Sequence, residues 1–90
     1  MFKTLEELIS VIRQRKRSST EESYTSKLLN NNKLSAEKVK EEITELIEAI
    51  EKNTNKVHEA ADVLYHLMVL LEANGIKIED VMDELKKRQK

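Results

Sequence analysis

The sequence predicts an all-α protein. Its 90 residues include no proline and one glycine, and 37% of them are charged whereas only 3% are aromatic. This composition is typical of helical proteins rich in Ala, Glu, Lys, Leu and Arg. Apolar residues recur at helical spacing, and no segment shows a strand pattern. Because a chain of this length forms one domain, residues 1–90, we expect an antiparallel bundle of about five helices, completed by dimerisation.

The composition also limits the classes of function. The chain has no cysteine, which excludes disulfides, thiolate chemistry and cysteine-ligated zinc. Its net charge of -1 provides no overall field for nucleic acid or an anionic membrane. The longest apolar run, Leu67–Leu71, is too short to span a bilayer, and the N-terminus lacks the apolar core of a signal peptide. The sequence therefore predicts a cytoplasmic protein with no nucleic-acid or membrane partner.

Two helices are expected in the N-terminal third. The apolar residues of the first lie at i, i+3, i+4 and i+7: Leu5, Leu8, Ile9 and Ile12. This spacing predicts an amphipathic helix over Lys3–Lys16. The basic run Arg13–Arg17 complements its dipole and is interpreted as a solvated helix end, with contact to a substrate phosphate or RNA as the alternatives. After a polar break at Ser18–Thr20, Ser23 is expected to cap a short helix over Tyr24–Leu29.

The third helix is expected after an asparagine-rich loop, Asn30–Asn32. Ser35 is a favourable N-cap for a helix from Ala36 to Lys52. Its expected apolar stripe consists of Val39, Ile43, Leu46, Ile47 and Ile50. The polar break Asn53–Asn55 ends this helix and predicts an antiparallel connection to the next one.

The fourth helix is expected over Lys56–Asn74, with Asn55 as its N-cap and Gly75 at the C′ position. Nearly every position in Ala60–Leu71 is apolar, which is typical of a helix buried on all sides. The other helices are too few to cover it, so we expect a homodimer. A last helix is predicted over Ile78–Arg88. Its inward residues should be Ile78, Val81, Met82 and Leu85.

Two acidic pairs carry the predicted chemistry. Glu42 and Glu45, like Glu59 and Asp62, are separated by three residues, which places each pair on one helix face. An antiparallel hairpin can bring the two pairs face to face. Four converging carboxylates require a cation, and oxygen ligands favour Mg²⁺ or Mn²⁺. The sequence therefore predicts a metal-dependent enzyme acting on a phosphate substrate. With 17 acidic residues in the chain, a solvated acidic face is the alternative for the first pair alone.

Several other side chains are candidates with two interpretations each. His66 could contact a ligating carboxylate or a substrate phosphate, but a hydrogen-bonded core or interface histidine is favoured. Tyr65 could stack on a base, but packing is favoured. Lys27 and Lys38 could bind phosphate as point charges or be ordinary surface lysines. Glu41 could be a fifth ligand or a surface glutamate.

Three stretches of the chain carry a family resemblance. They are Ser23–Leu29, Glu37–Glu45 and Glu59–Leu67. The Glu-x-x-Glu and Glu-x-x-Asp pairs resemble the all-α nucleotide pyrophosphohydrolase superfamily, typified by the MazG-like proteins. The Ser-Tyr-Thr-x-Lys-Leu and Asp-x-Leu-Tyr-His stretches are most similar to the phosphoribosyl-ATP pyrophosphohydrolase family of histidine biosynthesis. The chain departs from that family at Lys40, where a glycine is usual, and in the glycine-free loop at residues 30–34.

The resemblance implies Mg²⁺-dependent cleavage of the α–β phosphoanhydride of phosphoribosyl-ATP by a homodimer, giving phosphoribosyl-AMP and pyrophosphate. It implies these metal ligands: Glu42, Glu45, Glu59 and Asp62. Glu42 and its neighbour Glu41 are the expected catalytic carboxylates. The expected substrate contacts are Lys27, Lys38, Tyr24 and Arg17. A (d)NTP pyrophosphohydrolase of the same superfamily and a non-catalytic helical dimerisation module are the alternatives.

Overall fold

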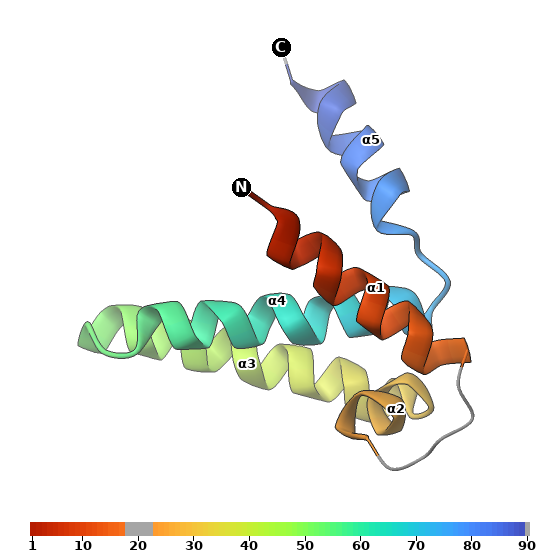
Figure 1. Ribbon diagram of the computed structural model, residues 1–90. Helices are drawn as coiled ribbons and strands as arrows, with labels where there is room; N and C mark the ends of the chain where they lie inside the picture. Colours follow the sequence, from red (N-terminus) through yellow and green to blue (C-terminus); the bar gives the residue numbers. More distant parts are fainter. Residues whose placement is uncertain (18–22, 90) are drawn as a thin grey trace.

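The computed structural model describes residues 1–17 and 23–89, which form helices and no strands. The five helices are α1 (Lys3–Arg17), α2 (Tyr24–Leu29), α3 (Asn32–Lys52), α4 (Lys56–Ala73) and α5 (Ile78–Arg88) (Figure 1). The predicted all-α class is therefore confirmed. The predicted break at Ser18–Thr20 lies outside the described residues.

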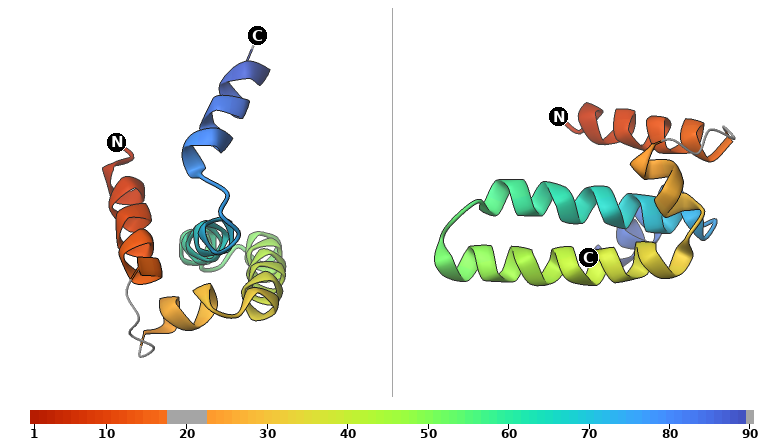
Figure 2. Two further views of the ribbon diagram at one scale, coloured as in Figure 1. Left: turned by 90° about the vertical axis from the view of Figure 1, so that its right-hand side faces the viewer. Right: turned by 90° about the horizontal axis from the view of Figure 1, so that it is seen from below.

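Helices α3 and α4 form the antiparallel hairpin on which the other helices are arranged (Figure 2). The hairpin turn begins at Asn53, which adopts a left-handed conformation with φ 56°, and Asn55 is also left-handed with φ 48°. Asparagine tolerates this region better than other residues with a side chain, which explains why the polar break reverses the chain here. The predicted hairpin is confirmed, and it sets the first turns of α4 beside the second half of α3.

Three residues predicted to mark helix ends occupy their expected positions. The Ser23 hydroxyl oxygen accepts the Ser26 N–H at 3.0 Å, so Ser23 caps α2 as expected. Gly75 has φ 70° after α4, and the Ile76 N–H donates to the Leu71 carbonyl at 2.9 Å, as in a Schellman motif. Asn55 precedes α4 as expected, but its side chain makes no capping hydrogen bond.

The predicted start of α3 is wrong by one helical turn. The helix begins at Asn32, because the Asn31 side chain accepts the Leu34 N–H at 3.0 Å and caps the helix four residues earlier than Ser35 would. Ser35 instead lies inside the helix and is buried. Asn31 and Ser35 are both favourable N-cap residues, and the helix uses Asn31, which comes first in the chain.

The core is small and centred on α4. Ile12 from α1, Leu28 from α2, and Met68 and Val69 from α4 form its buried cluster. The α1 stripe predicted from the sequence packs at this cluster, with Ile12 completely buried. Because α1 and α2 both pack against α4, the core also fixes α2 relative to the hairpin.

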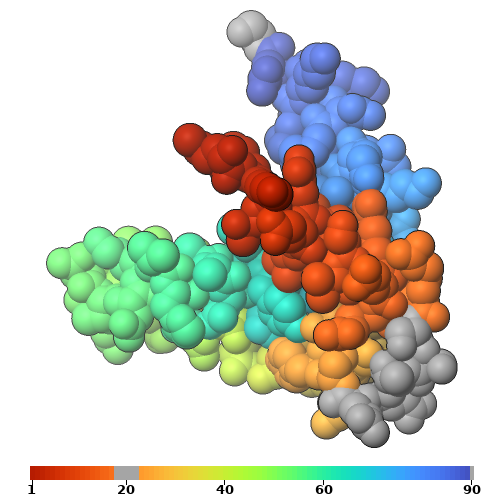
Figure 3. All heavy atoms as spheres, viewed as in Figure 1, coloured from red at the N-terminus to blue at the C-terminus, as the bar shows by residue number. Residues whose placement is uncertain are grey.

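Much of the expected inward surface is uncovered in the single chain. As expected for a chain with too few other helices to cover it, α4 is not buried on all sides, since Leu64 is 47% exposed. On α3, Val39 is buried, but the rest of the stripe includes the exposed residues Ile43, Ile47 and Ile50. On α5, which stands away from the hairpin (Figure 3), none of the described residues is buried. Two residues predicted to point inward there are about half exposed: Met82 and Leu85. The stripes of α3 and α5 therefore stay partly uncovered by the elements that the structure describes.

Candidate active site

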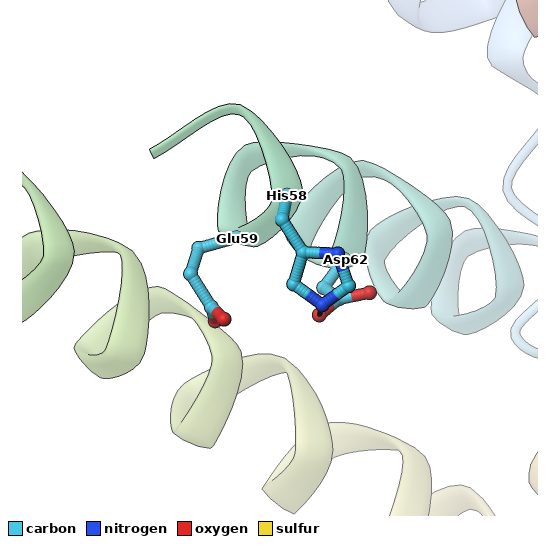
Figure 4. Close-up of side chains that lie close together, drawn as sticks. All are labelled: His58, Glu59 and Asp62. Atoms are coloured by element: carbon cyan, nitrogen blue, oxygen red, sulfur yellow. Dashed lines mark ion pairs between the residues drawn. The ribbon is translucent and has the colours of Figure 1, made fainter. Parts of the chain in front are cut away.

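The two predicted acidic pairs face each other across the α3–α4 hairpin. Carboxylate oxygens of Glu42 and Glu45 from α3 and of Glu59 from α4 lie within 4.8 Å of one another. Glu59 and Asp62 form a second such group with His58, in which His58 Nε2 lies 3.4 Å from Asp62 Oδ2. Figure 4 shows these three side chains on the first turns of α4, with the Glu59 carboxylate directed toward α3. We call Glu42, Glu45, Glu59 and Asp62 the carboxylate cluster.

The carboxylate cluster brings negative charges into partly dehydrated surroundings. Glu42 is only 9% exposed. The Oε2 atoms of Glu42 and Glu59 are both buried without a hydrogen-bond partner among the described residues. Burial raises the pKa of Glu42, and the neighbouring Glu45 raises it further. Burial and Glu45 also raise the pKa of Glu59. Buried carboxylate oxygens without donors fit a cation that accepts oxygen ligands.

The structure does not bring every predicted residue into the cluster. Glu41 is exposed, and its Oε2 lies 3.5 Å from Lys38 Nζ. This contact raises the pKa of Lys38. Lys27 is exposed on α2, and Arg17 is exposed at the end of α1. The substrate contacts predicted for these basic residues stay predictions.

Arg13 is engaged within the chain and ties three helices together. Its Nε donates to Glu72 of α4 at 2.8 Å, and its two terminal nitrogens donate to Glu79 of α5 at 2.9 and 2.7 Å. The hydrogen bonds from Arg13 lower the pKa of Glu79 to about 2. Sequence reasoning missed this arrangement. The signal for it was Glu72, an acidic residue directly after the apolar run Leu67–Leu71, because a carboxylate requires a partner when it is buried.

An aromatic group lies between α2 and α4 next to the carboxylate cluster. His66 is 6% exposed, and its Nδ1 lies 2.8 Å from the Asp62 carbonyl oxygen. Since a carbonyl oxygen only accepts, Nδ1 carries the hydrogen. Nε2 lies 3.0 Å from the Tyr24 hydroxyl. The favoured interpretation of His66 as a hydrogen-bonded core histidine is confirmed. Tyr65 packs on Tyr24 and shares a hydrogen bond with Thr25, in agreement with the packing role favoured for it.

The fold and the carboxylate cluster define a class: all-α domains with acidic pairs facing each other across an antiparallel helix hairpin. Within this class, the sequence profile of the phosphoribosyl-ATP pyrophosphohydrolase family matches residues 5–89. The chain therefore belongs to the phosphoribosyl-ATP pyrophosphohydrolase family.

Relatives of the chain occur as separate proteins and as parts of larger ones. The chain is 44% identical over 93 residues to the phosphoribosyl-ATP pyrophosphatase of Metallosphaera sedula, and the match covers 100% of both chains. It is 47% identical over 88 residues to that of Methylobacterium nodulans, covering 94% of this chain and 82% of the relative. It is 43% identical over 93 residues to the chloroplastic histidine biosynthesis bifunctional protein hisIE of Arabidopsis thaliana. That match covers 94% of this chain but only 33% of the Arabidopsis protein.

A helix that crosses a bilayer must be long and continuously apolar. Among the residues described, no helix is both long and apolar enough to cross a membrane.

Proposed function

We propose that the chain hydrolyses phosphoribosyl-ATP to phosphoribosyl-AMP and pyrophosphate in histidine biosynthesis, with Mg²⁺ as its cofactor and Mn²⁺ as a substitute. Family membership and the names of the relatives support the reaction. The observation that carries the proposal for this chain is the carboxylate of Glu42, which is buried in the carboxylate cluster with an unpartnered oxygen. We also propose the cytoplasm as its location, in keeping with a phosphorylated small-molecule substrate.

The residues proposed to hold the ion are Glu42, Glu45, Glu59 and Asp62. Their donors are all carboxylate oxygens, the ligands that Mg²⁺ and Mn²⁺ prefer. When bound, such an ion neutralises phosphate oxygens and lowers the pKa of a coordinated water. The raised pKa values of Glu42 and Glu59 support this assignment, since a bound cation would offset both the burial and the neighbouring negative charge that raise them.

Other residues of the chain are assigned to proton transfer and substrate binding. Glu41 is exposed beside Glu42, so its carboxylate is available to accept the proton of the attacking water, with Glu42 as the other catalytic carboxylate. The contact between Glu41 and Lys38 keeps the Lys38 ammonium group next to this position, where it can meet a substrate phosphate. Lys27 and Arg17 are assigned to more distant phosphates, and Tyr24 to the nucleotide.

We assign the active form to a homodimer in which the uncovered apolar faces of two chains meet. The candidate interface residues are Ile43, Ile47 and Ile50 on α3 and Leu64 on α4, all of them exposed in the single chain. Burying one such side chain contributes roughly 1.5–3 kcal/mol, so a few of them can support association. A hydrophobic interface built around α3 and α4 would also lie close to the carboxylate cluster.

The test is release of pyrophosphate in the presence of Mg²⁺ from phosphoribosyl-ATP and from dNTPs. The wild type is compared with Glu42→Gln and with Glu48→Gln, a matched control at an exposed position of the same helix. We expect release from phosphoribosyl-ATP by the wild type and the control, and a loss of at least about 100-fold in Glu42→Gln.

Two other outcomes would change or overturn the proposed function. Release from dNTPs alone would retain the site and move the function to nucleotide sanitation by the same superfamily. No release from any substrate, together with no Mg²⁺ binding in calorimetry, would overturn the enzyme proposal. A helical dimerisation module would then remain.

A further inference from the structure

A chain of hydrogen bonds connects the carboxylate cluster to an exposed aromatic ring. It runs from the Asp62 carbonyl oxygen to His66 Nδ1 at 2.8 Å and from His66 Nε2 to the Tyr24 hydroxyl at 3.0 Å. Both ring nitrogens of His66 are therefore used, and the ring is buried. In the neutral imidazole, Nδ1 donates to the carbonyl, so Nε2 is the acceptor for the Tyr24 hydroxyl proton.

Tyr24 is half exposed and is held in place by two neighbouring rings. The residue is 47% exposed although its hydroxyl is bonded to a buried histidine. Its ring meets His66 edge to face, with centroids 5.8 Å apart and planes at 78°. It lies nearly parallel to Tyr65, with centroids 6.4 Å apart and planes at 16°. These contacts restrain the ring on two sides and leave aromatic surface open to solvent.

The hydrogen bonds from His66 to the Asp62 carbonyl and to the Tyr24 hydroxyl place Tyr24 near the proposed site. Burial is the main cause that raises the pKa of Tyr24, and Lys38 opposes it. The negative charges of Glu42 and Glu41 also raise the pKa of Tyr24. The open ring thus lies near both the carboxylate cluster and the lysine assigned to a substrate phosphate. A phosphate bound there would leave the attached nucleoside within reach of the ring.

We infer that Tyr24 is the stacking surface for the purine base of the nucleotide and that His66 is the residue that positions it. The inference rests on the proposed function and extends it to the part of the nucleotide that Tyr24 contacts and to the residue that positions Tyr24. Aromatic rings bind bases through stacking and tolerate variation in the base. A free tyrosine side chain loses rotational freedom when it stacks. Because the bond to His66 fixes the ring beforehand, less freedom is lost on binding.

The experiment compares the KM and kcat of Tyr24→Phe, His66→Asn, His66→Gln and the double variant Tyr24→Phe/His66→Asn with phosphoribosyl-ATP. Phenylalanine keeps the ring but lacks the hydroxyl. Asparagine can keep the bond to the Asp62 carbonyl but is too short to reach Tyr24, whereas the longer glutamine can replace the acceptor at Nε2. We expect Tyr24→Phe and His66→Asn to raise KM about fivefold, the loss of one hydrogen bond, with kcat changed less than about twofold.

Two further results are expected if the hydrogen bond itself is responsible. The double variant should raise KM about as much as either single variant, because both remove the same bond. His66→Gln should recover most of the wild-type KM. Mn²⁺ affinity, measured by titration calorimetry without nucleotide, should be unchanged in all variants.

Tyr65→Phe is the matched control. It removes the hydroxyl that bonds to Thr25, a second bond between the same two helices, and keeps the aromatic ring. We expect Tyr65→Phe to lose about as much thermal stability as Tyr24→Phe, but its KM should not change. An active wild type whose KM is unchanged in Tyr24→Phe would overturn the inference alone, as would an equal rise in KM for Tyr65→Phe. If the wild type releases no pyrophosphate from any nucleotide, the proposed function fails and the inference fails with it.

Discussion

At the scale of single residues, Glu42 shows a conflict between folding and the proposed function. Its carboxylate is buried beside other carboxylates, and the resulting rise in pKa means that the charged form is less favourable in the folded than in the unfolded chain. This unfavourable term is present at neutral pH and is relieved when pH falls below the usual range of a glutamate. Without a cation, the carboxylate cluster therefore lowers the stability of the protein.

This conflict predicts that Glu42→Gln stabilises the metal-free protein. The amide removes the buried charge but keeps the shape of the side chain, so we expect the free energy of unfolding to rise by about 1 kcal/mol. Chemical denaturation in EDTA at pH 7 measures the change. Glu48→Gln, at an exposed position, should change stability little. An equal or lower stability of Glu42→Gln would contradict the prediction.

The contribution of Glu79 to stability should depend on pH in the opposite direction to that of Glu42. Its pKa is lowered to about 2 by the hydrogen bonds from Arg13, so ionised Glu79 is favoured in the folded state. Its contribution to stability is complete above the usual pKa of a glutamate, 4.5, and is lost as pH falls toward 2. Urea denaturation should therefore find wild type more stable than Glu79→Gln at pH 6, with the difference shrinking between pH 4.5 and 2.

A control variant for this pH series is Glu84→Gln. Glu84 pairs with Arg88 at 3.2 Å within α5, and both side chains are largely exposed. Such a pair contributes little, so this variant should follow the wild type throughout the series. If the difference in stability between wild type and Glu79→Gln stays constant down to pH 2, the contact with Arg13 does not control that difference.

At the scale of helices and turns, the left-handed residue after α4 controls how the chain leaves the hairpin. Gly75 has φ 70°, and a β-carbon added there would meet nothing within 4 Å. Any cost of a side chain at this position therefore comes from the backbone conformation and not from a clash. The turn directs the chain to α5, whose first turn carries Glu79 to Arg13.

We predict that Gly75→Ala lowers the free energy of unfolding by about 1 kcal/mol, the cost of a left-handed alanine. Gly75→Asn should lower it less, because asparagine tolerates this conformation. Thermal denaturation of the wild type, Gly75→Ala and Gly75→Asn measures the order of their stabilities. If alanine and asparagine prove equal to glycine, the left-handed geometry does not limit stability here.

At the scale of the whole molecule, the uncovered apolar stripes predict self-association. Ile47 is 53% exposed in the single chain and lies between the other exposed isoleucines of α3. Ile47→Glu should convert the proposed dimer to a monomer, since a charge would replace an apolar side chain in the interface. Sedimentation equilibrium gives the mass directly.

The matched control for self-association is Val11→Glu. Val11 is an exposed apolar residue too, at 43% exposure, but it lies on α1 and not on the hairpin. We expect it to retain the dimer. A wild type that is monomeric at the concentrations used for assays would contradict the homodimer.

The sequence by itself determined the helices and the acidic pairs. Apolar spacing within each segment indicates a helix without knowledge of the fold, whereas capping residues placed the start of α2 correctly and the start of α3 one turn too late. The hairpin was also predictable, because the polar break at residues 53–55 connects two strongly periodic helices. Once the hairpin was expected, the meeting of Glu42 and Glu45 with Glu59 followed from their spacing.

Only the tertiary structure decided which residues meet across helices and which apolar faces stay open. The bonds of Arg13 to Glu72 and of Tyr24 to His66 join residues 59 and 42 positions apart, and no local pattern encodes such a pairing. The apolar stripe of α3 was predicted, but its exposure in the single chain was not, because an apolar stripe shows that a face needs covering and not what covers it. The physical reason is the same in both cases: helical periodicity is a property of one segment, whereas packing depends on how all segments share the available surface.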